Sequence, residues 1–191
     1  MLGVECIILA AGFGNRFGGD KLLAELPSGN TVLSETVSVY QNVFENIAIV
    51  CRPEQIKIFS SAISSAAKLK FIPNEKAKQG MSQSIRAGIS SVDCDKGWLI
   101  ALADMPFVQV ATIESIVQKV ENKEIVRPIY NDKIGNPVYI SIAYKNELQQ
   151  IDGDRGARRL IERADQNDVL NLTVDDPGVL RDIDTVEDIP S

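Results

Sequence analysis

Residues 4–21 read VECIILAAGFGNRFGGDK, and their pattern determines how the rest of the chain is interpreted. Val4 to Leu9 is an apolar run typical of a buried strand, and it leads directly into four glycines and two cations. Because the run is short and carries Glu5, we interpret it as a strand and not as a signal peptide or a membrane span. The glycines then lie at the carboxyl end of a strand, where open α/β sheets bind ligands.

The remainder of the chain alternates between strand-like and helix-like segments, which is typical of a parallel sheet flanked by helices. The expected elements are strands at 47–51, 69–72 and 98–102, helices at 32–44, 56–63, 81–89, 113–120 and 156–164, and two strands joined by a turn at 131–135. The length of 191 residues suffices for one substantial core. We therefore expect a single α/β domain over residues 1–191, with a three-layer, mostly parallel, Rossmann-like sheet and helices on both faces.

Composition excludes several classes of function. The formal net charge is −6, so the chain lacks the basic surface that a nucleic-acid-binding protein needs, and no nucleic acid or membrane partner is expected. Histidine is absent, which removes the commonest general base and metal ligand. The three cysteines have no C-x-x-C spacing and fit core thiols of a cytoplasmic protein. Any catalysis must use carboxylates, Lys, Arg, backbone amides or a hard metal ion.

The glycine-rich loop has the chemistry to bind a polyphosphate. Its glycines let backbone N–H groups approach phosphate oxygens, while Arg16 offers a planar donor fork and Lys21 a compact charge. The loop does not fit the Rossmann fingerprint G-x-G-x-x-G, in which the third glycine comes one residue earlier than it does here. It does not fit the P-loop either, because there a Lys directly follows Gly and a Ser or Thr follows the Lys. An ordinary glycine-rich turn with solvated cations is the alternative interpretation.

Carboxylates are expected at the same edge of the sheet. Asp104 follows the strand predicted at 98–102, and Asp182 and Asp184 share a face if their segment is extended. Together they offer the oxygen ligands that Mg²⁺ prefers, with substrate phosphates completing its shell. The alternative to a metal site is that Asp104 only forms a turn and that Asp182 and Asp184 are solvated carboxylates of a loop.

A further anion-binding element is expected where a helix begins after Gly80, with Ser82 as its cap. The unsatisfied N–H groups of a helix start attract phosphate. Ser82, Ser84 and Arg86 can add donors toward a ribose or a phosphate, whereas a simple capped helix would give them no such role.

Five segments in the same order resemble the motifs of the MobA-like nucleotidyltransferases, specifically the molybdenum cofactor cytidylyltransferase (MocA-like) branch. They are LAAGFGNRFGGDK at 9–21, NEKAKQGMSQSIRAG at 74–88, ADMP at 103–106, GDRGAR at 153–158 and DIDTVED at 182–188. The resemblance runs through the whole chain. It implies a fold of the nucleotide-diphospho-sugar transferase type and transfer of a nucleoside monophosphate to a phosphorylated small molecule.

We expect Lys21, Arg16 and Asp104 to be catalytic, with Lys21 stabilising the α-phosphate and Arg16 the departing pyrophosphate. The resemblance implies further roles for the residues that match. The metal ligands would be Asp104, Asp184 and Asp182, holding Mg²⁺ or, alternatively, Mn²⁺. The nucleotide-binding residues would be Leu9, Ala10, Ala11, Gly12, Gly14, Asn74, Ser82, Ser84 and Arg86.

The identity of the base is indicated by Ala11, because the guanylyltransferase branch has Gly at that position. An added methyl group beside the base narrows the pocket and favours a pyrimidine. We therefore expect CTP and molybdopterin as substrates and molybdopterin cytosine dinucleotide and pyrophosphate as products. The resemblance implies a molybdoenzyme or its maturation chaperone as the protein partner.

The acceptor side departs from the branch, since Gly135-Asn136-Pro137 stands where its members usually have Gly-His-Pro. Asn136, Arg155 and Arg158 are the expected acceptor-binding residues, the two arginines for its phosphate. Two alternatives stay open. One is cytidylyl or guanylyl transfer to another phosphorylated acceptor, such as GTP-dependent transfer to molybdopterin or transfer to a sugar or polyol phosphate. The other is a nucleotide-binding protein that delivers cofactor without turnover.

Overall fold

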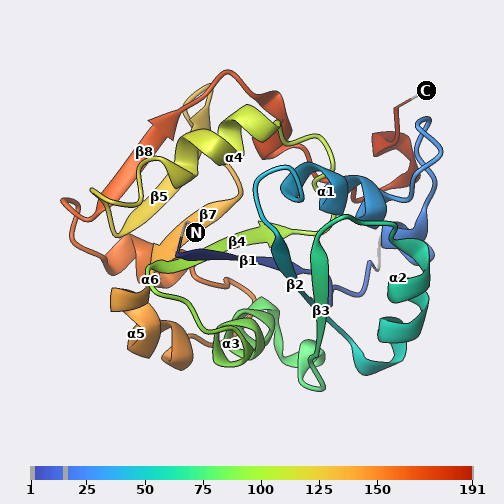
Figure 1. Ribbon diagram of the computed structural model, residues 1–191, viewed down its shortest axis with the longest axis horizontal. Coiled ribbons are helices and arrows are strands. Elements are labelled where there is room, and N and C mark those ends of the chain that lie inside the picture. The colour runs from blue at the N-terminus through green and yellow to red at the C-terminus, as the bar shows by residue number, and fades with distance from the viewer. Residues whose placement is uncertain (1–2, 15–16, 191) are drawn as a thin grey trace.

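The computed structural model describes residues 3–14 and 17–190 and has the expected α/β architecture (Figure 1). Its central sheet has the strand order β3-β2-β1-β4-β7-β5-β6, and β8 pairs with β5. The parallel half consists of β1 (Val4–Leu9), β2 (Asn46–Cys51), β3 (Lys68–Pro73) and β4 (Gly97–Leu102). The glycine-rich loop therefore leaves the central strand of this half, between β2 and β4.

The second half of the sheet departs from simple alternation. β7 (Val138–Ser141) runs antiparallel to both β4 and β5 (Ile125–Tyr130). The predicted pair of strands is therefore confirmed, but the turn between them contains a short third strand, β6 (Lys133–Ile134), which folds back on the end of β5. β8 (Val169–Thr173) pairs in parallel with β5 and was not predicted, because this half-buried strand lacks a continuous apolar run.

Helices cover both faces of the sheet, which confirms the three-layer prediction (Figure 1). The alternation along β1 explains the two cores, since Cys6 and Ile8 pack into one and Ile7 and Leu9 into the other. The helices on the Cys6 side are α1 (Val32–Tyr40), α2 (Ile56–Ala62) and α4 (Val110–Val117). Those on the opposite side are α3 (Met81–Ser91), α5 (Lys145–Gln150) and α6 (Arg158–Arg163).

Short 3-10 helices connect these elements. They span Lys21–Leu23, Pro53–Gln55, Ala77–Gln79, Ile142–Tyr144, Pro177–Leu180 and Val186–Asp188. Within the part of the chain that the structure describes, no helix has the length and apolarity that crossing a membrane requires.

The start of α3 corrects the expectation that Ser82 caps it. Gly80 is the N-cap, with φ of 103°, and Ser82 lies inside the helix with its hydroxyl buried and without a hydrogen-bond partner among the described residues. A Cβ at Gly80 would lie 2.5 Å from Asp154 Oδ1 and 2.6 Å from the carbonyl carbon of Gly153. Glycine is therefore required, because the 153–156 turn packs directly against the helix start.

The C-terminal segment returns from β8 to the carboxyl end of β4 and is anchored by the buried carboxylate of Asp176. Its Oδ2 accepts hydrogen bonds from the N–H of Gln109 at 2.9 Å and from the hydroxyl of Thr112 at 2.7 Å. Its Oδ1 accepts one from the N–H of Gly178 at 2.8 Å. Asp176 thus ties the start of α4 to the returning segment.

Beyond this anchor, the segment reaches the end of β4. The N–H of Ile183 donates to the carbonyl oxygen of Asp104 at 2.9 Å, which places the residues on either side of Ile183 beside Asp104. A capping box formed by Thr185 and Asp188 then begins the last 3-10 helix.

Replacing Asp176 with Ala should lower the free energy of unfolding by roughly 2–4 kcal/mol, because three donors lose a charged acceptor and two of the donor groups are buried. Urea denaturation of the variant measures this change. The neighbouring Asp175→Ala, at an exposed position, is the matched control and should change stability by at most about 0.5 kcal/mol. Equal effects of the two substitutions would contradict the anchoring role.

Candidate functional site

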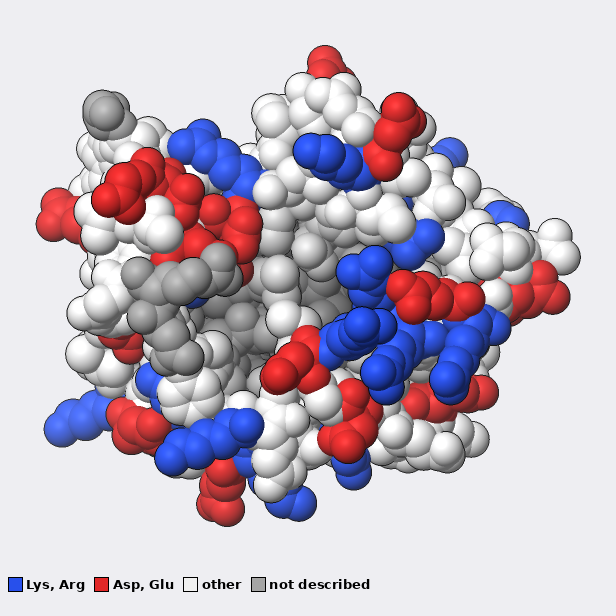
Figure 2. All heavy atoms as spheres, turned by 180° about the vertical axis from the view of Figure 1, so that it is seen from behind, with Lys and Arg blue, Asp and Glu red and all other residues white. Residues whose placement is uncertain are grey.

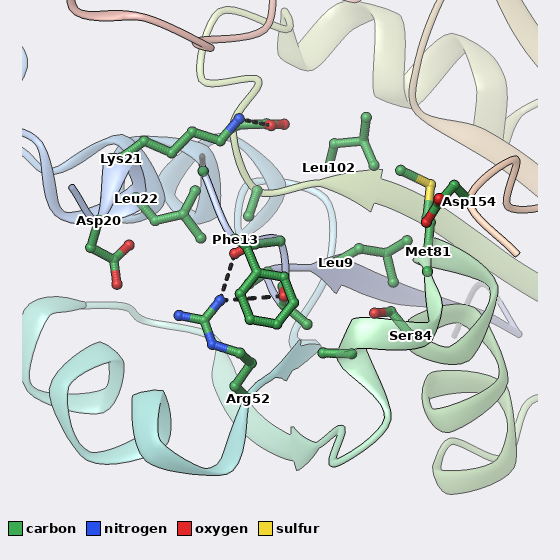
Figure 3. A pocket seen from close by; sticks show the side chains of 18 of the residues that line it. Leu9, Phe13, Asp20, Lys21, Leu22, Arg52, Met81, Ser84, Leu102 and Asp154 are labelled. Carbon is green, nitrogen blue, oxygen red and sulfur yellow. Dashed lines mark hydrogen bonds and ion pairs between the residues drawn. The ribbon is translucent and has the colours of Figure 1, made fainter. Parts of the chain in front are cut away.

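A cavity of about 500 Å³ opens at the carboxyl ends of β1 and β4 (Figure 3). Its walls come from the glycine-rich loop, from the start of α3 and from the residues that follow β4. The described lining residues include Leu9, Ala10, Ala11, Gly12, Phe13, Gly14, Lys21, Arg52, Met81, Ser84, Leu102, Asp104 and Asp154. Of the three residues predicted to be catalytic, Lys21 and Asp104 line this cavity, and Arg16 lies outside the described residues.

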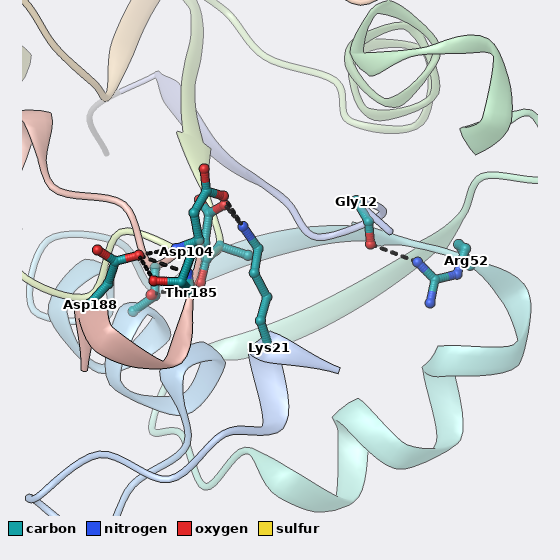
Figure 4. Close-up of polar contacts among 9 residues, drawn as sticks. Gly12, Lys21, Arg52, Asp104, Thr185 and Asp188 are labelled. Atoms are coloured by element: carbon teal, nitrogen blue, oxygen red, sulfur yellow. Dashed lines mark hydrogen bonds and ion pairs between the residues drawn. The ribbon is translucent and has the colours of Figure 1, made fainter. Parts of the chain in front are cut away.

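Lys21 connects two carboxylates at one end of the cavity. Its Nζ donates to Asp104 Oδ2 at 2.7 Å and to Asp184 Oδ1 at 2.9 Å (Figure 4). Partial burial by itself lowers the pKa of Lys21, but the hydrogen bonds and charges of Asp104 and Asp184 outweigh this effect. The net pKa of Lys21 is raised, so the ammonium stays charged at neutral pH.

Asp182 completes a cluster with these two carboxylates. One carboxylate oxygen from each of Asp104, Asp182 and Asp184 lies within 4.8 Å of the others. Burial raises the pKa of Asp182, and the charges of Asp184 and Asp104 raise it further. Asp104 Oδ1 is buried and has no hydrogen-bond partner among the described residues. A hard divalent cation fits this donor set, because it consists of oxygens in an environment with surplus negative charge.

The loop after β1 is held between the neighbouring strands. The N–H of Ala10 donates to the carbonyl oxygen of Val50 at 2.7 Å, and the N–H of Ala103 donates to that of Leu9 at 3.1 Å. Gly14 has φ of 58°, and a Cβ there would lie 3.5 Å from Lys21 Cγ. The loop therefore curves around the stem of Lys21. All five loop residues predicted to bind nucleotide line the cavity, namely Leu9, Ala10, Ala11, Gly12 and Gly14.

The predicted nucleotide-binding residues of α3 and of the segment before it divide into two groups. Ser84 lines the cavity, and the buried Asn74 donates from Nδ2 to Ser84 Oγ at 2.9 Å. Asn74 therefore positions Ser84 and does not line the cavity itself. Ser82 and Arg86 are not among the described lining residues either, since the hydroxyl of Ser82 points into the protein interior.

A second cavity, also of about 500 Å³, adjoins the first and shares Leu9, Met81 and Leu102 with it. Its floor is apolar and includes Ile85, Ile100, Val138, Ile140 and Ile161. Its polar lining comprises all three residues predicted to bind the acceptor, two further cations and one carboxylate: Asn136, Arg155, Arg158, Arg127, Lys133 and Glu162. Arg158 Nε donates to Glu162 Oε1 at 2.8 Å. Figure 2 shows basic side chains gathered beside the hollow on this face of the molecule.

Sequence reasoning missed several residues of the two cavities. Arg52 follows β2 and precedes Pro53, so its position suggested only a helix start. Arg127 lies in the strand expected before the 131–135 turn, and Lys133 lies in that turn. No motif distinguishes either residue. Asp154 belongs to the GDRGAR segment, and its motif was the available signal.

Comparison with known proteins places the chain among nucleotide-handling enzymes. A family model described as the MobA-like NTP transferase domain matches residues 6–169. The molybdenum cofactor cytidylyltransferase of Escherichia coli is 22% identical over 188 residues, which cover 98% of this chain and 94% of that protein. The purine catabolism protein PucB of Bacillus subtilis is 26% identical over 194 residues, which cover 95% of this chain and 92% of that protein.

Among solved structures, Rv0371c of Mycobacterium tuberculosis in complex with manganese superimposes with a TM-score of 0.77. It is 26% identical in sequence, and the alignment covers 97% of this chain and 95% of that chain. The structural similarity therefore extends over nearly the entire chain.

Replacing Lys21 with Met should lower the free energy of unfolding by about 1–3 kcal/mol in the presence of EDTA, because Asp104 and Asp184 lose their shared cation. Mn²⁺ should then raise the melting temperature of the variant more than that of the wild type, which thermal denaturation with and without Mn²⁺ measures. The exposed Lys57→Met is the matched control. Equal Mn²⁺ stabilisation of all three proteins would contradict binding at these carboxylates.

Proposed function

The chain belongs to the family of MobA-like NTP transferases and is a nucleotidyltransferase, and from this premise we propose that it transfers CMP from CTP to molybdopterin. The products are molybdopterin cytosine dinucleotide and pyrophosphate. The observation that carries the proposal is the pair of adjoining cavities with a common wall at Leu9, Met81 and Leu102. One cavity has the glycine-rich loop and the Lys21–carboxylate cluster, and the other has an apolar floor with cations and an amide at its rim.

The donor triphosphate occupies the first cavity. Its phosphates lie against the N–H groups of the glycine-rich loop. These groups donate hydrogen bonds and carry no negative charge that would repel the phosphates. The ammonium of Lys21, which lines this cavity, turns from the carboxylates to an oxygen of the α-phosphate. Arg16 is proposed to neutralise the departing pyrophosphate. The base lies near Ala11, whose methyl group leaves room for a pyrimidine.

The reaction is an in-line displacement at the α-phosphorus. An oxygen of the acceptor phosphate forms the new P–O bond, and the bond from the α-phosphorus to the oxygen that bridges it to the β-phosphorus breaks, so that pyrophosphate leaves with that oxygen. Because a phosphate monoester is already an anionic nucleophile, the step requires no histidine as a base. The protein contributes alignment of the two substrates and electrostatic stabilisation.

Asp104, Asp182 and Asp184 are proposed to hold a divalent cation, Mg²⁺ or alternatively Mn²⁺. Such an ion neutralises negative charge on the phosphates as a Lewis acid when it is bound. The unpaired, buried Oδ1 of Asp104 supports this assignment. Lys21 balances the charge of the carboxylates in the absence of nucleotide.

The second cavity is proposed to take the acceptor. A ring system fits against its apolar floor, while Arg155 and Arg158 supply charge to anionic groups and Asn136 supplies an amide donor and acceptor. Molybdopterin combines a fused heterocycle with anionic groups and matches this lining. A molybdoenzyme or its maturation chaperone is the proposed recipient of the product.

Substituting Lys21 with Ala or Asp104 with Ala should each reduce pyrophosphate release from CTP and molybdopterin by roughly 100-fold or more, because each removes charge stabilisation at the reacting phosphate. Circular dichroism should show that both variants keep their secondary structure. Lys57→Ala, at an exposed position of α2, is the control and should keep wild-type turnover. Near wild-type rates in both site variants would refute the mechanism.

Substituting Arg155 with Ala should raise the KM for molybdopterin by about tenfold and leave the dissociation constant of CTP unchanged, because this arginine lines the second cavity alone. Arg159→Ala is the matched control, since Arg159 faces a different hollow between α5 and α6. A loss of CTP affinity in Arg155→Ala without a change in KM for the acceptor would contradict the assignment of the two cavities.

A further inference from the structure

We propose that Arg52 is a positioning residue that aims the N–H groups of the glycine-rich loop at the phosphates of the donor nucleotide. Arg52 follows β2 and lines the first cavity beside the loop (Figure 3). No motif of the sequence drew attention to it. The inference rests on the placement of the triphosphate proposed above, and it does not depend on which base or acceptor the enzyme uses.

Contacts on three sides fix the guanidinium of Arg52. Its Nη1 donates to the carbonyl oxygen of Gly12 at 2.7 Å and to that of Ala11 at 3.4 Å. Its Nε donates to Glu54 Oε1 at 2.9 Å, and its Cζ lies 4.7 Å from the centre of the Phe13 ring. Only 17% of the side chain is exposed. Such a fork of directed donors over an aromatic face is specific to arginine.

The planarity of the peptide bond connects these contacts to the phosphate site. In a trans peptide the carbonyl oxygen of one residue and the N–H of the next point in opposite directions. Because the carbonyls of Ala11 and Gly12 point to Arg52, the N–H groups of Gly12 and Phe13 point away from it. Figure 4 shows Lys21 and Arg52 on opposite sides of Gly12. These two N–H groups therefore point away from Arg52, and Lys21 lines the same cavity as Gly12 and Phe13.

The same two N–H groups are available to a ligand. Neither donates a hydrogen bond to any described residue, although they lie in the wall of a cavity. Unpaired, adjacent backbone N–H groups form a concave donor surface of the kind that binds phosphate oxygens. Arg52 is itself engaged by Gly12, Glu54 and Phe13, so it acts on the nucleotide through the loop.

The loop needs this support because Gly12 allows its peptide groups to rotate. Glycine restricts its backbone least, and no described atom lies within 4 Å of the place that a Cβ on Gly12 would occupy. If the peptide between Gly12 and Phe13 turned over, a carbonyl oxygen would face the phosphates in place of an N–H. The hydrogen bonds from Arg52 favour the orientation that binds an anion.

The test is calorimetric titration of wild type, Arg52→Met and Arg52→Lys with three probes in Mg²⁺ and without acceptor. The probes are the nucleoside triphosphate that the wild-type enzyme turns over, inorganic pyrophosphate and the corresponding nucleoside. We expect Arg52→Met to weaken binding of triphosphate and pyrophosphate by about tenfold or more and of the nucleoside by at most about twofold. Arg52→Lys should recover little of the lost affinity, because an ammonium keeps the positive charge but lacks the planar, directed donors of the guanidinium.

Two controls accompany these variants. Arg163→Met, at an exposed position of α6, removes an arginine remote from the loop and should bind all three probes as the wild type does. Glu54→Gln leaves the Gly12 contact intact and should have a smaller effect than Arg52→Met. Melting temperatures of all variants show whether a loss of affinity reflects unfolding.

Three results would overturn the inference. If Arg52→Met weakens the binding of nucleoside and triphosphate equally, Arg52 acts at the base. If Arg52→Lys restores full affinity, only the positive charge of Arg52 matters. If neither substitution changes the affinities, Arg52 has no positioning role. The proposed function fails in a different measurement. A wild-type enzyme that turns over a triphosphate other than CTP would refute the base assignment, while the comparison among Arg52 variants would proceed with that triphosphate.

Discussion

The ammonium of Lys21 joins three segments that are far apart in the chain, and the rest of the site depends on this junction. Asp104 and Asp184, its two partners, are 83 and 163 residues away. They meet because β1 and β4 are parallel neighbours that end at the same edge of the sheet, and because the hydrogen bond from Ile183 to Asp104 fixes the C-terminal segment beside that edge. Without a cation between them, these carboxylates would repel each other.

The junction lies in the first of two adjoining cavities. The loop and Lys21 line the cavity proposed for the donor, and residues of β5, β7 and α6 line the cavity proposed for the acceptor, with Leu9, Met81 and Leu102 common to both. The 153–156 turn contributes to both, since Asp154 lines the first cavity and Arg155 the second. Because that turn packs on Gly80, the start of α3 fixes the relative position of the two cavities.

Much of this arrangement could be predicted from local patterns in the sequence. Buried strands such as β1 and β4 are predominantly apolar, and the loop glycines and the aspartates that follow the strands are recognisable from their spacing. The parts that escaped prediction depend on tertiary contacts. Arg52 acquires its role only because the end of β2 lies beside the loop after β1. Likewise, Ser82 was expected to cap α3, but the packing of Gly153 against Gly80 determines how that helix begins.

The central claim is that one site transfers CMP from CTP to molybdopterin, and pyrophosphate release by the wild-type enzyme tests it most directly. CTP, GTP and ATP are each assayed with and without molybdopterin, in Mg²⁺ and in Mn²⁺. The account predicts rapid release only when CTP and molybdopterin are present together with a divalent ion. Release that prefers GTP or ATP, or that requires another phosphorylated acceptor such as a polyol phosphate and ignores molybdopterin, would contradict it.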